Sequence, residues 1–242
     1  MNVLWLILMC FAGLLMAWAE ARASGQDRYP NIPEPMVFDM MRLLGAHKGE
    51  FETNAFGSTP LSGPDHGVSW APEMEYAFMD GMAVEFEFPF ENEWLAEYKL
   101  GLQATLGSFN GGRSAHGVQY MGIYDRTGHT WRNTLVYLLG HRFNGQWSTM
   151  NMLGMADISL ARADQRNGLI LNHSTFYNLT EQTVLGIEIN YQDGYQGHLL
   201  VMPQIHQELG QQINLQLGIG ANKNHHESST YPEVGLRLVR QF

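Results

Sequence analysis

The chain has 242 residues, of which 45% are hydrophobic and 16% charged, and its 24 acidic and 14 basic side chains give a net charge of −10. An acidic chain without a basic cluster is a poor nucleic-acid binder, so we expect no nucleic-acid partner. The length fits one β-barrel or β-sandwich as well as two small domains. The only cysteine, Cys10, lies in an N-terminal apolar run, so an exported product would depend on its core or on sheet closure rather than on disulfides.

The first 23 residues have the features of an export signal. Residues 3–18 are almost unbroken in apolar character, and Ala21-Arg22-Ala23 offers a small-x-small cleavage site before Ser24. The run is short for a membrane-spanning helix. We therefore expect a signal peptide over residues 1–23, with an uncleaved anchor as the alternative.

Residues 24–49 form a separate lead-in to the rest of the chain. They contain three of the nine prolines and a short run, residues 36–44, that could form a two-turn helix ended by Gly45. Two interpretations stay open for this segment. It is either a periplasmic lead-in or a plug that enters the barrel.

From residue 50 onward, strand signals recur every ten to sixteen residues and are separated by turn clusters such as Asp80-Gly81 and Asn144-Gly145. In the segment 97–107, for example, the even-numbered side chains are Tyr, Leu or Ala, and the odd-numbered ones between them are mostly polar or Gly. The predicted strands are 50–57, 71–79, 82–90, 97–107, 116–125, 130–142, 147–160, 168–177, 183–192, 197–207, 212–221 and 231–242. Alternation over about ten residues and an even number of strands are typical of transmembrane β-barrels.

We therefore predict an all-β fold, an antiparallel transmembrane β-barrel of about 12 strands over residues 50–242. A soluble sandwich is the alternative, because it also alternates, with its apolar face turned inward. The length of the strands and their polar faces rich in Gln, Asn, Glu and Gly favour the barrel. Two features speak against it: Pro203 removes a ladder donor unless a bulge absorbs it, and residues 108–115 are long for a periplasmic turn.

Two stretches carry a resemblance to a known family. One is the motif Pro72-Glu73-Met74-Glu75-Tyr76 with Asp80 after it and a following strand that ends Phe88-Pro89-Phe90; the other is the closing strand ending Leu238-Val239-Arg240-Gln241-Phe242. Together with the signal peptide they resemble the outer-membrane proteins of the MetA-pathway of phenol degradation family, described as transport or channel proteins without an agreed substrate. The resemblance implies a location in the cell outer membrane and an interaction with the barrel assembly machinery. The assembly signal would be Leu236, Leu238 and Phe242, from which Arg240 departs.

The predicted hairpin 71–90 places four carboxylates on one inner wall. A three-residue loop over 79–81, with Gly81 in the left-handed conformation, would pair Phe78 with Met82. The side chains on the lumen face would then be Glu73, Glu75, Glu85 and Glu87, with Glu75 opposite Glu85 and Glu73 opposite Glu87. Like charges so placed destabilise a sheet unless something compensates them.

Compensation for these carboxylates could come from the basic lumen residues Lys99, Arg132 and Arg237, from a bound cation or from raised carboxylate pKa values. The wall is then either a solvated part of the lumen or a constriction that attracts cations.

Metal and enzyme sites have weaker support. His66 in the first long loop and His225 and His226 in the last could meet as imidazole ligands, but solvated loop histidines are the alternative. Met150 and Met152 fall on the presumed lipid face, which favours packing over coordination.

A lipid hydrolase would need a serine within reach of a histidine. In Asn172-His173-Ser174 neighbouring side chains point to opposite faces of a strand, so His173 cannot activate Ser174. His141 lies on another predicted strand, and its partners are unknown from the sequence.

The function that these patterns predict is a passive channel or small-solute transport protein, with a narrow or partly plugged pore. We expect no enzymatic activity and no cofactor. Small solutes or cations would pass, and outer-membrane lipid would surround the barrel. A non-conducting structural or interaction barrel and an outer-membrane lipid hydrolase remain as alternatives.

Overall fold

The structure is a computed structural model that describes residues 29–38, 40–63, 67–158, 168–193, 197–210, 212–225 and 229–242. The predicted signal peptide over 1–23 lies outside these residues. Within the described part of the chain, no helix is long and apolar enough to cross a membrane.

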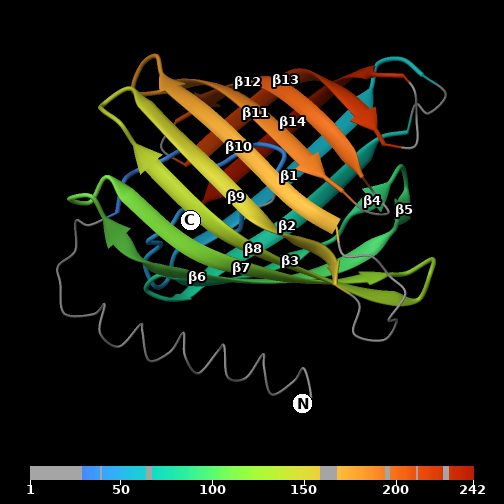
Figure 1. The fold of residues 1–242 in the computed structure, drawn as a ribbon, viewed down its shortest axis with the longest axis horizontal. Helices are drawn as coiled ribbons and strands as arrows, with labels where there is room; N and C mark the ends of the chain where they lie inside the picture. The colour runs from blue at the N-terminus through green and yellow to red at the C-terminus, as the bar shows by residue number, and fades with distance from the viewer. Residues whose placement is uncertain are drawn as a thin grey trace.

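The described residues form one closed antiparallel barrel of twelve long strands (Figure 1). Neighbouring strands pair in chain order, and β1 closes the ring because it pairs with both β14 and β2. The long strands are β1 (Phe51–Pro60), β2 (Ser69–Met79), β3 (Met82–Glu87), β6 (Glu97–Phe109), β7 (Ser114–Asp125), β8 (Thr130–Arg142), β9 (Trp147–Ile158), β10 (Gly168–Asn178), β11 (Thr183–Gln192), β12 (His198–Glu208), β13 (Ile213–Asn224) and β14 (Tyr231–Gln241). The all-β, 12-strand antiparallel barrel expected from the sequence is confirmed.

Most strand boundaries lie close to those predicted, and the differences have local causes. The third strand stops at Glu87, because Pro89 cannot donate to a ladder and the chain turns into the short hairpin of β4 (Phe90–Glu91) and β5 (Trp94–Leu95) on the edge of β2. The β6–β7 connection spans only residues 110–113, so it is as short as the other turns at its end of the barrel.

Pro203 needs no bulge. It pairs with Ile187 of β11, and the ladder to β13 is interrupted at Met202 and Pro203 without a change of register.

The connections alternate in length, which distinguishes the two ends of the barrel. We call one the turn end: it holds the start of β1, the end of β14 and the short connections 80–81, 110–113, 143–146, 179–182 and 209–212. The opposite end, the loop end, holds the connections that follow β1, β3, β7, β9, β11 and β13.

The outer wall is apolar in its middle and aromatic near its ends. Leu, Ile and Val side chains such as Leu100, Leu153 and Leu217 are exposed there. Aromatic pairs lie at the turn end (Phe51–Phe242 and Trp147–Tyr177) and at the loop end (Trp70–Phe90 and Tyr124–Trp131). A band of aliphatic side chains between two aromatic girdles is the outer surface of a membrane barrel.

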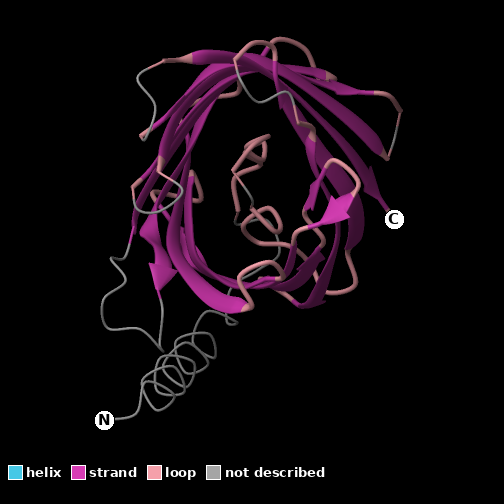
Figure 2. Cartoon of the chain, turned by 90° about the vertical axis from the view of Figure 1, so that its right-hand side faces the viewer, coloured by secondary structure: helices cyan, strands magenta, loops and turns pink. Residues whose placement is uncertain are grey.

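Residues 29–50, which we call the inner segment, run inside the ring of strands (Figure 2). The segment starts near the turn end, where Arg142 donates to the backbone oxygen of Asn31. It returns to the same end, where the backbone N–H of Gly81 donates to the oxygen of Ala46 over 2.7 Å.

The inner segment is not helical at 36–38 or 40–44, so the predicted two-turn helix is wrong. Two turn-type bonds join its backbone groups, Ala46 N–H to Leu43 O and Glu50 N–H to His47 O, and several other backbone groups bond to side chains of the wall. Gln103 Nε2 donates to the oxygen of Arg42 over 2.7 Å, and the N–H of Gly45 donates to Thr105 Oγ1 over 2.9 Å.

The wall is apolar where the inner segment presents apolar side chains. Ile32, Met40 and Leu44 pack in one buried cluster with side chains of β7 to β10. Met150 and Met152 belong to this cluster and are 1% and 2% exposed, so the prediction that they face lipid is wrong. They turn inward because the inner segment supplies an apolar partner there, which a water-filled lumen would not.

Candidate functional site

The hairpin of β2 and β3 has the register predicted from the sequence. Glu75 pairs with Glu85 and Glu73 with Glu87, and all four side chains, which we call the acidic wall, are buried inside the barrel. Met74 and Phe86, between them, are 44% and 48% exposed on the outer face.

The turn of this hairpin differs from the prediction. Met79, not Phe78, pairs with Met82, and a bulge at Phe78 takes up the extra residue. The loop is therefore the two residues Asp80-Gly81, and Gly81 has a φ of 74°, the left-handed conformation expected of it.

Two of the three predicted basic residues compensate the acidic wall. Arg237 of β14 is 2% exposed and donates from Nη2 to Glu73 Oε1 over 2.8 Å, and this nitrogen lies 3.7 Å from Glu75 Oε1. Lys99 of β6 lies beside Glu87, with Nζ 2.8 Å from Oε2.

Arg132 is placed elsewhere. It forms ion pairs with Glu97 and Asp157 on the β6–β9 side of the barrel.

The sequence analysis missed a third cation, Arg42 of the inner segment. It is 4% exposed and forms ion pairs with Glu50 and Glu52, while its Nη1 lies 4.0 Å from Glu75 Oε2. The signal was present, because Arg42 is the one charged residue within the otherwise apolar stretch 40–46. A buried arginine is stabilised by carboxylates around it, so this residue attaches the inner segment to the wall.

Glu34 brings a further carboxyl group into the same region from the inner segment. Burial, with the nearby charge of Glu52, raises the pKa of Glu34 from 4.5 to about 8. A carboxyl group with such a pKa holds its proton at neutral pH.

Glu188 of β11 receives the tip of the inner segment. Its Oε2 accepts from the N–H groups of Met36 and Val37 over 3.0 and 3.1 Å, and its Oε1 accepts from that of Phe38 over 2.7 Å. The carboxylate is fully buried, and neighbouring amides on the wall also donate to it: Asn172, Asn190 and Gln204. Three consecutive backbone N–H groups around one oxyanion form an anion-binding nest, here filled by the protein's own side chain.

Arg237 also holds the tip, through the backbone oxygen that precedes the nest. Its Nη1 donates to the backbone oxygen of Pro35 over 3.0 Å, next to the N–H groups that Glu188 accepts. The tip is thus fixed by a buried cation and a buried anion of the wall.

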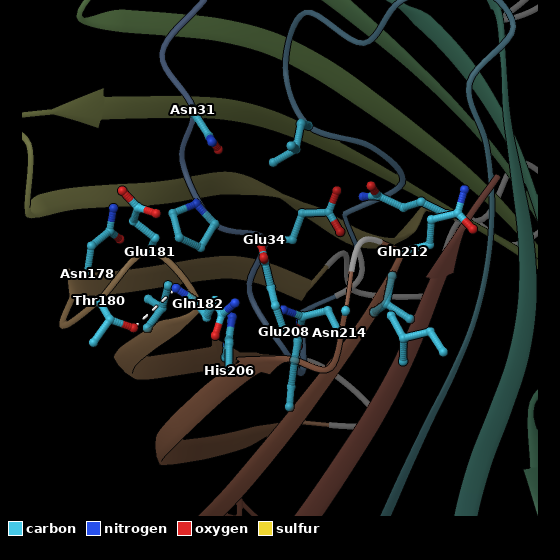
Figure 3. Close-up of a pocket in the computed structure, with 18 of the residues that line it drawn as sticks. Asn31, Glu34, Asn178, Thr180, Glu181, Gln182, His206, Glu208, Gln212 and Asn214 are labelled. Atoms are coloured by element: carbon cyan, nitrogen blue, oxygen red, sulfur yellow. Dashed lines mark hydrogen bonds between the residues drawn. The ribbon is translucent and has the colours of Figure 1, made fainter.

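Two cavities border the inner segment. A cavity of about 220 Å³, the loop-end vestibule, is lined by Met36 and Val37 of the tip and by charged side chains of the wall, Glu73, Glu87, Lys99 and Arg237. A cavity of about 230 Å³, the turn-end vestibule, is lined on the inner segment by Asn31, Pro33 and Glu34 (Figure 3). The inner segment therefore contributes to the lining of both cavities.

Of the three predicted metal candidates, His225 lies within the described residues. His66 and His226 lie outside them, and His225 has its Nδ1 3.8 Å from Asp193 Oδ1 and its ring beside Tyr191. In the described part of the chain, one group of three or more ligand-type side chains has oxygens within 4.8 Å of one another, and it consists of Glu73, Glu85 and Glu87 of the acidic wall.

A serine–histidine hydrogen bond does exist, but not where the sequence motif was considered. Ser114 Oγ lies 2.7 Å from His141 Nδ1 at the turn end of β7 and β8. Ser114 is 1% exposed, so a substrate cannot reach its hydroxyl group. In Asn172-His173-Ser174 the ring of His173 bonds instead to Asn151 and Thr175 on the outer face, while Ser174 is fully buried.

Comparison with known proteins identifies the class of fold. No protein-family model matches the chain, and no curated protein sequence matches it. The solved structures that resemble it are bacterial outer-membrane β-barrel channels. The outer membrane channel from Pseudomonas putida F1 has a TM-score of 0.63 at 12% identity, over 82% of this chain and 98% of that one.

Two porins resemble the chain to a similar degree. The NanC porin has a TM-score of 0.64 at 6% sequence identity, and the match covers 78% of this chain and 100% of that porin. The KdgM porin has a TM-score of 0.60 at 8% sequence identity, and the match covers 79% of this chain and 99% of that porin. At such identities the similarity shows the fold alone, an antiparallel β-barrel like those of these channels.

Proposed function

We propose that this protein is an outer-membrane channel for small solutes whose lumen is closed by the inner segment in the conformation described. The observation that carries the proposal is the attachment of the inner segment. Its tip is held by the polar contacts with Glu188 and Arg237, inside a barrel whose outer face is apolar. Because these contacts join side chains of the wall to the tip and are not part of the ladders between strands, the tip can detach without unfolding the strands.

The resemblance to the MetA-pathway of phenol degradation family agrees with this proposal, because that family is described as transport or channel proteins. We propose the same family, the same location and the same dependence on the barrel assembly machinery for this chain. The outward positions of Leu236, Leu238 and Phe242, exposed by 46%, 46% and 58%, support their role as its assembly signal.

The charge of the interior favours cations over anions. The acidic wall, Glu52 of β1 and Glu34 of the inner segment bring six carboxyl groups together, and three cations face them, Arg42, Lys99 and Arg237. The carboxyl groups are Glu34, Glu52, Glu73, Glu75, Glu85 and Glu87. Acidic linings raise the local concentration of cations and their passage.

The test is the reversal potential of the purified protein in planar bilayers under a KCl gradient. We expect cation selectivity in the wild type and a shift toward zero when both Glu75 and Glu85 are replaced by Gln. The matched control is Glu93→Gln, at an exposed position of the loop-end hairpin. Unchanged reversal potentials in the double variant would refute the role of the acidic wall, and silence of every variant would favour a structural barrel.

A further inference from the structure

We propose that the turn-end vestibule binds a small organic cation with N–H donors, of the diamine class, through Glu34, His206, Glu208, Asn214 and Gln216. The inference deepens the channel proposal and rests on it, since it names the solute class that the lumen would take.

Four of these side chains form one patch on the wall. His206 of β12 pairs with Gln216 of β13, and Glu208 pairs with Asn214 two positions further along the same two strands. Side chains so paired stand about 5 Å apart on one face of a sheet. All four line the turn-end vestibule, and Glu34 lines it from the inner segment (Figure 3).

Three of the four side chains of the patch, and Glu34, carry a buried polar atom that has no hydrogen-bond partner among the described residues. His206 and Gln216 are 3% and 4% exposed, and among the described residues His206 Nε2 and Gln216 Oε1 have no hydrogen-bond partner. The same holds for Asn214 Oδ1 and Glu34 Oε1. Buried polar atoms in proteins are almost always paired, so a cavity with several unpaired acceptors around it fits a ligand that donates.

The charge of the lining specifies a cation. Three carboxyl groups line the vestibule, from Glu34, Glu181 and Glu208, against one cation in the lining, Arg142, while the charges of Arg42 and Arg237 also act on the carboxyl group of Glu34. Arg142 donates to the backbone oxygens of Asn31 and Gly145, so it is already engaged at the rim. A buried carboxyl group such as that of Glu34 gains most from a ligand that brings a positive charge.

The size of the vestibule favours an organic cation over a bare metal ion. Its volume is about 230 Å³. Within the described residues, no three ligand atoms of His, Asp or Glu in this cavity come within 4.8 Å of one another, as a metal ion would need. A diamine can instead present its two ammonium groups to acceptors on different sides of the cavity.

The experiment is calorimetric titration of the full mature protein in detergent with putrescine, and with 1,4-butanediol as a neutral molecule of the same length. We expect saturable putrescine binding, at least tenfold weaker in Glu34→Gln and in Glu208→Gln, and no measurable binding of butanediol. Glu93→Gln is the matched control and should bind as the wild type does. Glu208 is exposed, so its variant folds even where Glu34→Gln perturbs the inner segment.

Equal putrescine binding by the wild type and Glu208→Gln, or butanediol binding as tight as that of putrescine, would overturn the proposal. Conductance measurements in planar bilayers distinguish a failure of the diamine-site proposal from a failure of the channel proposal. A conducting protein that binds no putrescine contradicts only the diamine site, and a protein that binds putrescine but never conducts contradicts only the channel.

Discussion

The carboxylate of Glu188 accepts a hydrogen bond of 2.7 Å from the backbone N–H of Phe38, a residue 150 positions earlier in the chain. This contact joins the wall of the barrel to the tip of the inner segment. Hydrogen bonds to a charged group contribute about 1.5–3 kcal/mol each, and Glu188 accepts three from consecutive backbone groups. The backbone of the tip is therefore held to β11 by this one buried side chain, in addition to the contacts of Arg237 and Arg42.

Replacing Arg42 with Met should loosen the inner segment. The substitution keeps the length of the side chain but leaves Glu52 and Glu75 buried without this cation, and breaking a buried ion pair costs about 3–5 kcal/mol. We expect faster amide hydrogen exchange over residues 36–46, measured by mass spectrometry, with unchanged exchange in the strands on the far side of the barrel. Arg126→Met at the loop end is the control. Equal exchange in the Arg42 and Arg126 variants would contradict this role.

The inner segment should be held more firmly at low pH than at high pH. The folded-state pKa of Glu34, about 8, lies above its usual 4.5, so the protonated form is the one that folding favours. The contribution of Glu34 to the free energy of unfolding is fully present below about pH 4.5 and is lost as the pH rises through about 8. Hydrogen exchange of residues 32–38, corrected for its intrinsic pH dependence, should rise over this range. A Glu34→Gln variant should flatten the rise, and an equally steep rise in that variant would exclude Glu34 as its cause.

Binding of a cation beside Glu34 should release protons near pH 7. The carboxyl group is mostly protonated there, and a neighbouring positive charge favours its ionised form. The enthalpy of putrescine binding should therefore depend on the ionisation enthalpy of the buffer at pH 7, where the amines of putrescine keep their protons. Glu34→Gln serves as the reference without the ionisable group. A buffer-independent enthalpy in the wild type at pH 7 would show that Glu34 does not take part.

Placing a charged side chain on the outer wall should lower the stability of the barrel in lipid. Leu153 is 55% exposed on the outer face in the middle of β9. In lipid, an arginine near the middle of the bilayer costs about 2–4 kcal/mol. Urea unfolding of Leu153→Arg from lipid vesicles should show this loss, whereas Glu93→Arg at the loop end should unfold like the wild type. A soluble fold would instead tolerate both variants equally.

The barrel could be predicted because the sequence patterns that define its strands and turns lie within short stretches of the chain. Alternation within each strand, as in Lys99-Leu100-Gly101-Leu102, and turn residues such as Asp80-Gly81 fix the strands, and the pairing of Glu75 with Glu85 then follows from one hairpin. The inner segment could not be predicted in this way. Arg42 finds its carboxylates and Met150 finds its apolar partners only after the ring of strands has closed around residues 29–50, and periodicity carries no record of such contacts.

The same limit applies to the vestibules. His206 and Gln216 look in the sequence like any other polar positions of alternating strands, and their shared cavity with Glu34 exists only in three dimensions. Pro203, by contrast, was expected to need a bulge, and the ladder simply opens beside it.

The most direct test of the account is single-channel recording of the wild type, Glu188→Gln and Glu188→Ala in planar bilayers. We expect the open probability to increase in that order, because Gln keeps one acceptor for the N–H groups of residues 36–38 and Ala keeps none. Glu233→Gln, which replaces another buried carboxylate that accepts from Asn222 and, among the described residues, makes no hydrogen bond or ion pair with the inner segment, should record as the wild type does. A wild type and Glu188→Ala that are correctly folded and conduct identically, or not at all, would contradict the claim that the inner segment closes a channel.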